Sequence, residues 1–137
     1  MKNEAVIDGI TVGGSPNAEE LTSGRFTTVV NVRLDDEPGN DTAAVLAGRK
    51  GVAYTSVPWT IDTVTKEDIA RVREAVDAAD GPVLVHCMGG TRAAVAAAII
   101  SAERDGSGAA GALAKVSEAG YEVGGTAYAA FIASYFS

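Results

Sequence analysis

The hydrophobic positions along the chain fall into short runs that are separated by turn residues. Residues 5–7 and 10–12 are apolar runs on either side of Asp8-Gly9, a pair that favours a β-hairpin turn. Residues 26–32 are rich in β-branched side chains and predict a buried strand. Two further strands are expected over residues 52–57 and 83–85.

Helical patterns lie between and after these runs. Ser15 is expected to cap the first helix, and Thr65 with Asp68 resembles a capping box. The fourth helix is apolar almost all round, which predicts a buried central helix. The last helix carries an aromatic stripe that we expect to pack in the core. The predicted helices cover residues 17–21, about 41–49, 65–79, 92–103, 109–119 and 128–136.

Strands that alternate with helices predict an α/β protein. We expect a three-layer fold in which a central, mostly parallel sheet is flanked by helices. A chain of 137 residues is long enough to bury a core of its own. Residues 1–137 are therefore expected to form a single domain.

Charge and composition narrow the classes of partner. The net charge is −7 and no basic stripe stands out, so neither nucleic acid nor an anionic membrane is an expected partner. The longest apolar run, residues 93–100, is too short to span a bilayer. One cysteine excludes an internal disulfide, and with a single histidine it leaves little for a metal site. We expect no metal, no other cofactor and a cytoplasmic location.

The candidate chemistry gathers in residues 83–93. The strand to residue 85 leads into His86 and Cys87, a loop with Gly89 and Gly90 follows, and a helix begins near Arg92. Backbone amides at such a helix N-terminus form a nest that binds anions, and an arginine fork suits a tetrahedral oxyanion. The same field would favour the thiolate of Cys87 as a nucleophile. Alternatively, Cys87 is only a small buried hydrophobe.

The expected ligand-binding residues are those that surround this nest. They are His86, Met88, Gly89, Gly90, Thr91 and Arg92.

The pattern His86-Cys87-x-x-x-x-Arg92 resembles the phosphate loop of protein tyrosine and dual-specificity phosphatases. More narrowly, residues 5–122 resemble the bacterial β-lactamase-hydrolase-like, phosphatase-like family. The resemblance implies a tyrosine-phosphatase-like fold, with Cys87 as the nucleophile and Arg92 as the oxyanion clamp. It implies that His86 tunes the thiolate and holds the loop, while its side chain points the other way along the strand.

A phosphatase of this kind needs a general acid on a nearby loop. Asp62, in the loop behind Pro58-Trp59, is the best candidate, although it could equally be a solvated aspartate. Asp35 and Asp36 are weaker candidates. Arg33 could aid anion binding or pair with a nearby acid.

The sequence departs from the phosphatase pattern at two points. Four residues separate Cys87 from Arg92, where tyrosine phosphatases usually have five. Ala93 stands where they usually carry serine or threonine, and Thr91 lies on the other side of Arg92. The shorter loop matches the length typical of rhodanese-like sulfurtransferases.

Three functions therefore remain open. The leading hypothesis is a cysteine-dependent phosphatase-like hydrolase that forms a phosphocysteine and acts on a phosphorylated small molecule or a phosphoprotein. The second is a sulfurtransferase that takes sulfur from a sulfane-sulfur donor as a Cys87 persulfide. The third is a non-catalytic module that binds phosphoproteins or oxyanions such as phosphate or sulfate.

Overall fold

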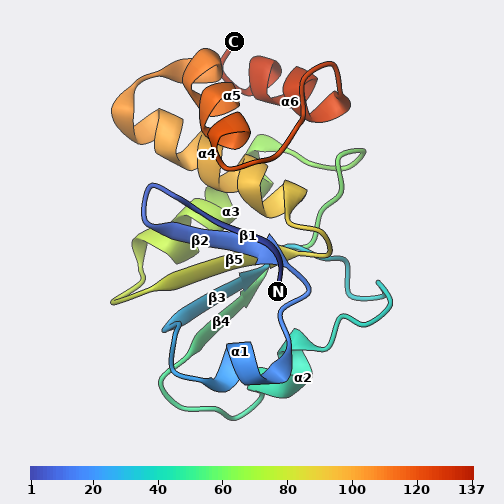
Figure 1. The fold of residues 1–137 in the computed structure, drawn as a ribbon, viewed down its shortest axis with the longest axis vertical. Helices are drawn as coiled ribbons and strands as arrows, with labels where there is room; N and C mark the ends of the chain where they lie inside the picture. The colour runs from blue at the N-terminus through green and yellow to red at the C-terminus, as the bar shows by residue number, and fades with distance from the viewer.

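A five-stranded sheet with helices on both faces forms the centre of the protein, which a computed structural model describes over residues 1–137 (Figure 1). The strands lie in the order β1-β2-β5-β3-β4. Only the β1–β2 pair is antiparallel. The strands are β1 (Lys2–Ile7), β2 (Ile10–Gly14), β3 (Thr28–Asn31), β4 (Ala53–Ser56) and β5 (Val83–Cys87). The predicted three-layer, mostly parallel α/β fold is confirmed.

The hairpin at the N-terminus forms where the sequence predicted it. Ile7 pairs with Ile10, and the two turn residues Asp8 and Gly9 have φ angles of 51° and 77°. Positive φ at both turn positions matches the right-handed twist of the two strands. At the other end of β2, Gly14 lies opposite Cys87 in β5. The hairpin therefore ends beside the candidate loop.

The helices form two unequal layers (Figure 1). Side chains on β5 alternate between them, since Val83, Val85 and Cys87 join the large core cluster and Leu84 joins the small one. The small layer holds α1 (Ala18–Thr22) and α2 (Thr42–Leu46). The large layer holds α3 (Lys66–Asp77), α4 (Thr91–Asp105), α5 (Gly108–Glu118) and α6 (Ala127–Tyr135).

Helix α4 is the buried central helix that its apolar sequence predicted. Every residue from 93 to 102 is buried. Seven of these ten residues are alanine or serine, whose small side chains let the helix lie close to β2 and β5. Gly90 and Gly106, both left-handed, flank its two ends. Because α4 is packed tightly along its length, the position of its N-terminus is fixed.

Two local predictions need correction. Asn17, not Ser15, caps α1, in a capping box with Glu20. Helix α2 ends at Leu46 rather than near residue 49, because Ala47 leaves helical angles and Gly48 is left-handed. The aromatic stripe of α6 packs on the core as predicted, since Ile132 is buried in the large core cluster and the aromatic side chains are half-buried against it.

The capping box of Thr65 and Asp68 at the start of α3 is confirmed. No helix in the structure is both long enough and apolar enough to cross a membrane.

Candidate active site

Cys87 occupies the last position of β5, directly before the turn into α4. Its side chain lies on the α4 side of the sheet and only 2% of the residue is exposed. The backbone N–H of Gly90 donates to the Cys87 sulfur at 3.1 Å. Gly90 adopts φ 102°, which a side chain would strain, so glycine permits the curl of this segment. We call residues 87–92 the Cys87 loop.

The other predicted ligand-binding residues surround this curl. Met88 is 39% exposed, and Gly89 and Thr91 are half-buried, with Thr91 at the first position of α4. The structure thus places the N-terminus of a helix and an exposed rim next to one buried thiol.

His86 lies behind the loop rather than in it. Its ring points to the face that carries α2, is fully buried, and places Nε2 3.1 Å from the hydroxyl of Thr42. Its Nδ1 lies 3.4 Å from the carbonyl oxygen of Cys87. Burial lowers the pKa of His86 to about 4, so the ring is neutral at physiological pH. The ring therefore supports the loop from behind and does not reach its open side.

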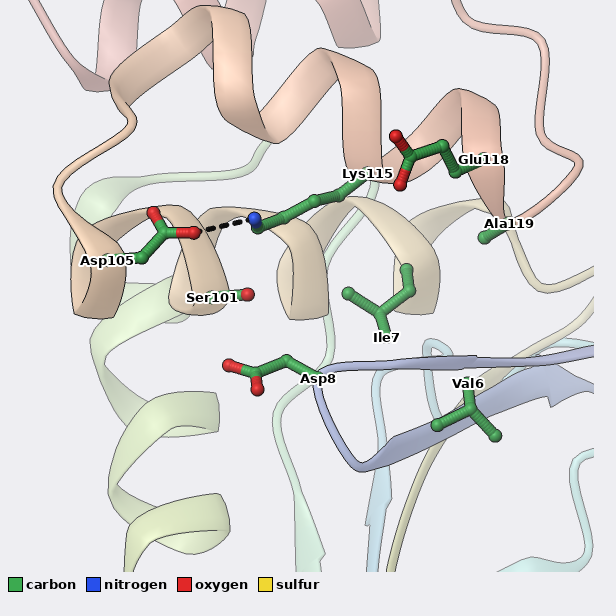
Figure 2. A pocket seen from close by; sticks show the side chains of 8 residues that line it. All are labelled: Val6, Ile7, Asp8, Ser101, Asp105, Lys115, Glu118 and Ala119. Atoms are coloured by element: carbon green, nitrogen blue, oxygen red, sulfur yellow. Dashed lines mark hydrogen bonds and ion pairs between the residues drawn. The ribbon is translucent and has the colours of Figure 1, made fainter.

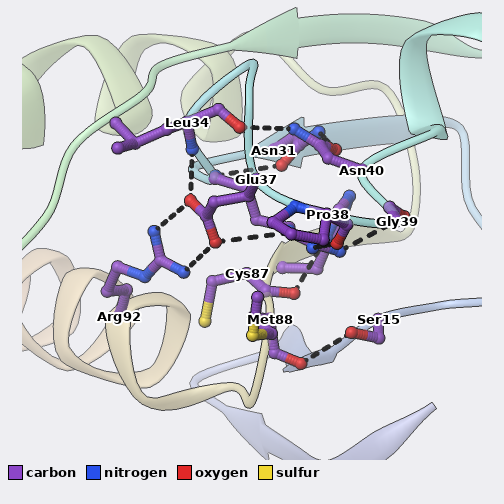
Figure 3. Close-up of polar contacts among 12 residues, drawn as sticks. Ser15, Asn31, Leu34, Glu37, Pro38, Gly39, Asn40, Cys87, Met88 and Arg92 are labelled. Atoms are coloured by element: carbon purple, nitrogen blue, oxygen red, sulfur yellow. Dashed lines mark hydrogen bonds and ion pairs between the residues drawn. The ribbon is translucent and has the colours of Figure 1, made fainter.

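Arg92 is held by a residue that the sequence did not single out. The carboxylate of Glu37 accepts from Nη1 and Nη2 of Arg92 at 2.9 and 2.8 Å (Figure 3). The Trp59 carbonyl accepts from Nη1 as well, at 3.1 Å. The hydrogen bonds from Arg92 lower the pKa of Glu37 to about 2, and the same pair raises the pKa of Arg92. Both groups are therefore charged across the physiological range.

These contacts leave one edge of the guanidinium free. A guanidinium carries five N–H donors in a rigid plane: each terminal nitrogen has a pair of them, and Nε has the last one. Glu37 and the Trp59 carbonyl take three of them, on Nη1 and Nη2. The remaining donors, on Nε and Nη2, lie parallel on one edge. Such a two-donor edge matches two oxygens of a tetrahedral oxyanion.

Arg33 pairs with an acid and supports the loop that follows β3. The residue is 3% exposed, and its Nε lies 3.6 Å from Glu37. Its terminal nitrogens donate to the carbonyls of Pro38 and Gly39. Of the two alternatives for Arg33, the structure thus supports pairing with an acid. This arginine fixes Glu37, which in turn holds Arg92.

Asp62 lies at the same end of the sheet but is not in contact with the sulfur. It is exposed, and it follows Trp59, whose carbonyl binds Arg92, by three residues. Tyr128, on α6, is half-buried. Burial raises the pKa of Tyr128, and this effect outweighs the charge of Arg92, which lowers it. Asp35 and Asp36 are exposed on the neighbouring loop.

A separate pocket of about 370 Å³ lies between the hairpin turn and helices α4 and α5 (Figure 2). Asp8, Asp105 and Glu118 line it, and its one cation, Lys115, is paired with Asp105 at 2.7 Å. Neither a cysteine nor a histidine lines this pocket. The groups that can carry out a reaction are gathered instead at the Cys87 loop.

The family of the chain follows from its sequence match. Residues 12–104 match the profile of the phosphatase-like domain of β-lactamase hydrolase-like proteins. The chain belongs to this phosphatase-like family. A β-lactamase hydrolase-like protein of Xylella fastidiosa is 35% identical over 100 residues. That match covers 68% of this chain and 23% of the relative, so the chain spans about a quarter of the relative's length.

Solved structures share the fold. A DUF442 protein from Shewanella putrefaciens has a TM-score of 0.79 at 17% identity, over 100% of this chain and 90% of that one. TpbA of P. aeruginosa has a TM-score of 0.72 at 26% identity, over 97% and 84% of the two chains. The predicted tyrosine-phosphatase-like fold of this phosphatase-like domain is therefore confirmed.

Proposed function

We propose that residues 1–137 form one cysteine-dependent phosphatase domain whose nucleophile is Cys87. The observation that carries the proposal is the thiol under the Gly90 amide, beside an Arg92 that keeps a two-donor edge free. Membership of a phosphatase-like family supports it. TpbA of P. aeruginosa has been solved in complex with pTyr, and the PP-IP phosphatase Siw14 of S. cerevisiae in complex with citrate. Both ligands are anions, so a phosphorylated small molecule or phosphoprotein is the proposed substrate class.

In the first step the Cys87 thiolate attacks phosphorus and the bond to the leaving-group oxygen breaks. The amides of the Cys87 loop and the free edge of Arg92 bind the equatorial oxygens, on which charge is spread in phosphoryl transfer. Glu37 keeps the guanidinium in one orientation, so little reorganisation is needed as charge moves. The product of this step is a phosphocysteine.

Asp62 supplies the proton for the leaving group. It lies on the exposed loop after β4, three residues beyond Trp59, whose carbonyl binds Arg92. The Trp59 carbonyl ties this loop to Arg92, and we expect movement of the loop to bring the carboxyl group over a bound phosphoester. Apo structures often show such groups out of reach of the reacting atoms.

In the second step water attacks phosphorus and the phosphorus–sulfur bond breaks. Asp62, now ionised, accepts a proton from this water, and inorganic phosphate leaves with the thiolate restored. Ala93 offers no hydroxyl to assist the departing thiolate and is fully buried. We therefore expect this step to limit the rate.

A sulfurtransferase is the second candidate, and the length of the Cys87 loop favours it. Four residues separate Cys87 from Arg92, which leaves a small ring of amides. A persulfide on Cys87 exposes one terminal sulfur, and a small ring can satisfy it. A sulfane-sulfur donor would then be the substrate. A module that binds phosphoproteins without turnover would keep the same loop and show no reaction.

One assay separates these functions. The wild-type protein is offered an aryl phosphate in one reaction and thiosulfate with cyanide in another, with Cys87→Ser as the control in both. We expect release of phosphate that depends on Cys87 and little thiocyanate. Thiocyanate without phosphate would establish the sulfurtransferase, and binding of phosphate without either product would establish the binding module.

A further inference from the structure

Three successive backbone carbonyls of the Cys87 loop accept hydrogen bonds from the N-terminal hairpin and from Ser15, the residue that follows β2. The Cys87 oxygen accepts from the Ser15 amide at 2.9 Å, and the Met88 oxygen accepts from the Ser15 hydroxyl at 2.8 Å. The Gly89 oxygen accepts from Nδ2 of Asn3, also at 2.9 Å. Ser15 is left-handed, with φ 47°, which turns the chain back onto the loop. The outer side of this loop is therefore bonded residue by residue.

The bond from Asn3 has a direct effect on the face turned toward the thiol. In a trans peptide the C=O of one residue and the N–H of the next point in opposite directions. Asn3 binds the oxygen of the peptide between Gly89 and Gly90, and the N–H of this same peptide donates to the Cys87 sulfur. Holding the oxygen outward keeps the N–H inward.

Asn3 is itself held in an unusual backbone conformation. Its φ of 54° lies in the left-handed region, where asparagine is tolerated better than most residues, and the β1–β2 register shifts around it. Its carbonyl accepts from the hydroxyl of Tyr121 at 2.6 Å. Tyr121 is 7% exposed, and burial raises its pKa to about 12, so the phenol stays protonated and remains a donor. The two residues are 118 positions apart in the chain.

Tyr121 also lies against the loop directly. A Cβ added at Gly90 would come within 2.2 Å of the Tyr121 hydroxyl oxygen. Asn3 and Tyr121 thus enclose the Gly89–Gly90 peptide from two sides, one by a hydrogen bond and one by contact.

We propose that Asn3 and Tyr121 are positioning residues that aim the Gly90 amide at Cys87 and at the oxyanion bound there. Both lie outside the 12–104 segment that defines the family match. The inference rests on the proposed function for its catalytic consequence, but the orientation of the Gly90 amide is measurable in any case.

Asn3→Gly removes the side-chain donor and retains tolerance of the left-handed backbone. Its matched control is Asp8→Gly, because Asp8 is a second non-glycine residue with positive φ in the same hairpin. Tyr121→Phe removes the hydroxyl that holds Asn3. Its control is Tyr135→Phe, which removes a hydroxyl bonded to the exposed Glu103.

Two readouts are compared across the four variants. Amide hydrogen exchange at Gly90, followed by NMR, should be faster in Asn3→Gly and Tyr121→Phe than in the wild type, and unchanged in the controls. Vanadate affinity, measured by titration calorimetry, should fall about threefold to tenfold in the same two variants, the usual worth of one hydrogen bond. A merely structural role would lower the melting temperature without a selective change at Gly90.

Equal Gly90 exchange in Asn3→Gly, Tyr121→Phe and their controls would overturn the positioning role. Faster exchange with unchanged vanadate affinity would also overturn it, since the amide would then have no part in anion binding. A wild-type protein that binds no vanadate, while Gly90 exchange still responds to the variants, would overturn the proposed function instead.

Discussion

The Glu37 carboxylate binds both terminal nitrogens of the Arg92 guanidinium, at 2.8 and 2.9 Å, across 55 residues of sequence. Both side chains are largely buried, with 14% and 12% of their surfaces exposed. This pairing turns a flexible arginine into a fixed fork, because only the edge that carries Nε stays available. The site is therefore organised by an acid that makes no contact with the sulfur.

Replacing Glu37 should weaken oxyanion binding although it removes a negative charge from the site. In Glu37→Gln the amide cannot accept two charged hydrogen bonds, so Arg92 loses its fixed orientation. We expect phosphate or vanadate affinity to fall about tenfold, the lower end of the worth of a hydrogen bond to a charged group. Asp36→Asn is the matched control, since it removes the same charge from the exposed neighbouring position. A gain in affinity in Glu37→Gln would show that Glu37 competes with the ligand instead.

The same pair makes stability depend on pH in the acid range. The pKa of Glu37 is lowered from 4.5 to about 2 in the folded protein. As the pH falls, Glu37 is therefore protonated in the unfolded chain before it is protonated in the folded protein. The stabilisation is complete above pH 4.5 and is lost as the pH falls toward 2. Chemical denaturation at pH 6 and pH 3 should show that Glu37→Gln costs stability at the higher pH and much less at the lower. A penalty of equal size at both values would contradict the charged pair.

His86 gives a second, separate window. Its pKa is lowered by burial from 6.5 to about 4, so between these values the unfolded chain is protonated and the folded chain is not. The free energy of unfolding should therefore rise with pH from 4 to 6.5 and then level off. His86→Gln should remove this slope while Thr42→Val, which loses only the hydroxyl partner, should retain it. If the slope is unchanged in His86→Gln, the pH dependence of the free energy of unfolding comes from other groups.

Asp62→Asn should slow the reaction in a manner that depends on the leaving group. A general acid contributes roughly a hundredfold or more when the leaving oxygen is a poor leaving group. An alkyl phosphate should lose that factor, and an activated aryl phosphate should lose much less. Asp35→Asn serves as the control from the nearby exposed loop. Equal losses for both substrates would show that Asp62 does not donate the proton.

Much of the fold follows from local signals in the sequence. Asp8-Gly9 between two apolar runs set the hairpin, and the apolar helix after Arg92 indicated burial on all sides. The cap of α1 has a local signal as well, because Asn17 and Glu20 have capping-box spacing, but Ser15 followed by Pro16 gives a competing cap signal. The structure uses Ser15 to bind the Cys87 loop instead.

The surroundings of the site could not be predicted in the same way. Glu37 ends an acidic run, and nothing in residues 35–37 distinguishes it from its exposed neighbours. Glu37, and not its neighbours, reaches Arg92 because Arg33 holds the loop after β3 in place through the carbonyls of residues 38 and 39. Asn3 and Tyr121 meet only because the first strand and the segment after α5 come together in space. Such contacts have no spacing pattern along the chain.

The most direct test of the central claim is to trap the intermediate on Cys87. The wild-type protein is mixed rapidly with an activated aryl phosphate, quenched in acid, and digested for mass spectrometry of the peptide that contains Cys87. The account predicts that a phosphoryl group appears on Cys87 within the first turnover and decays when substrate is exhausted. Release of phosphate with Cys87 unmodified at every time point would contradict it.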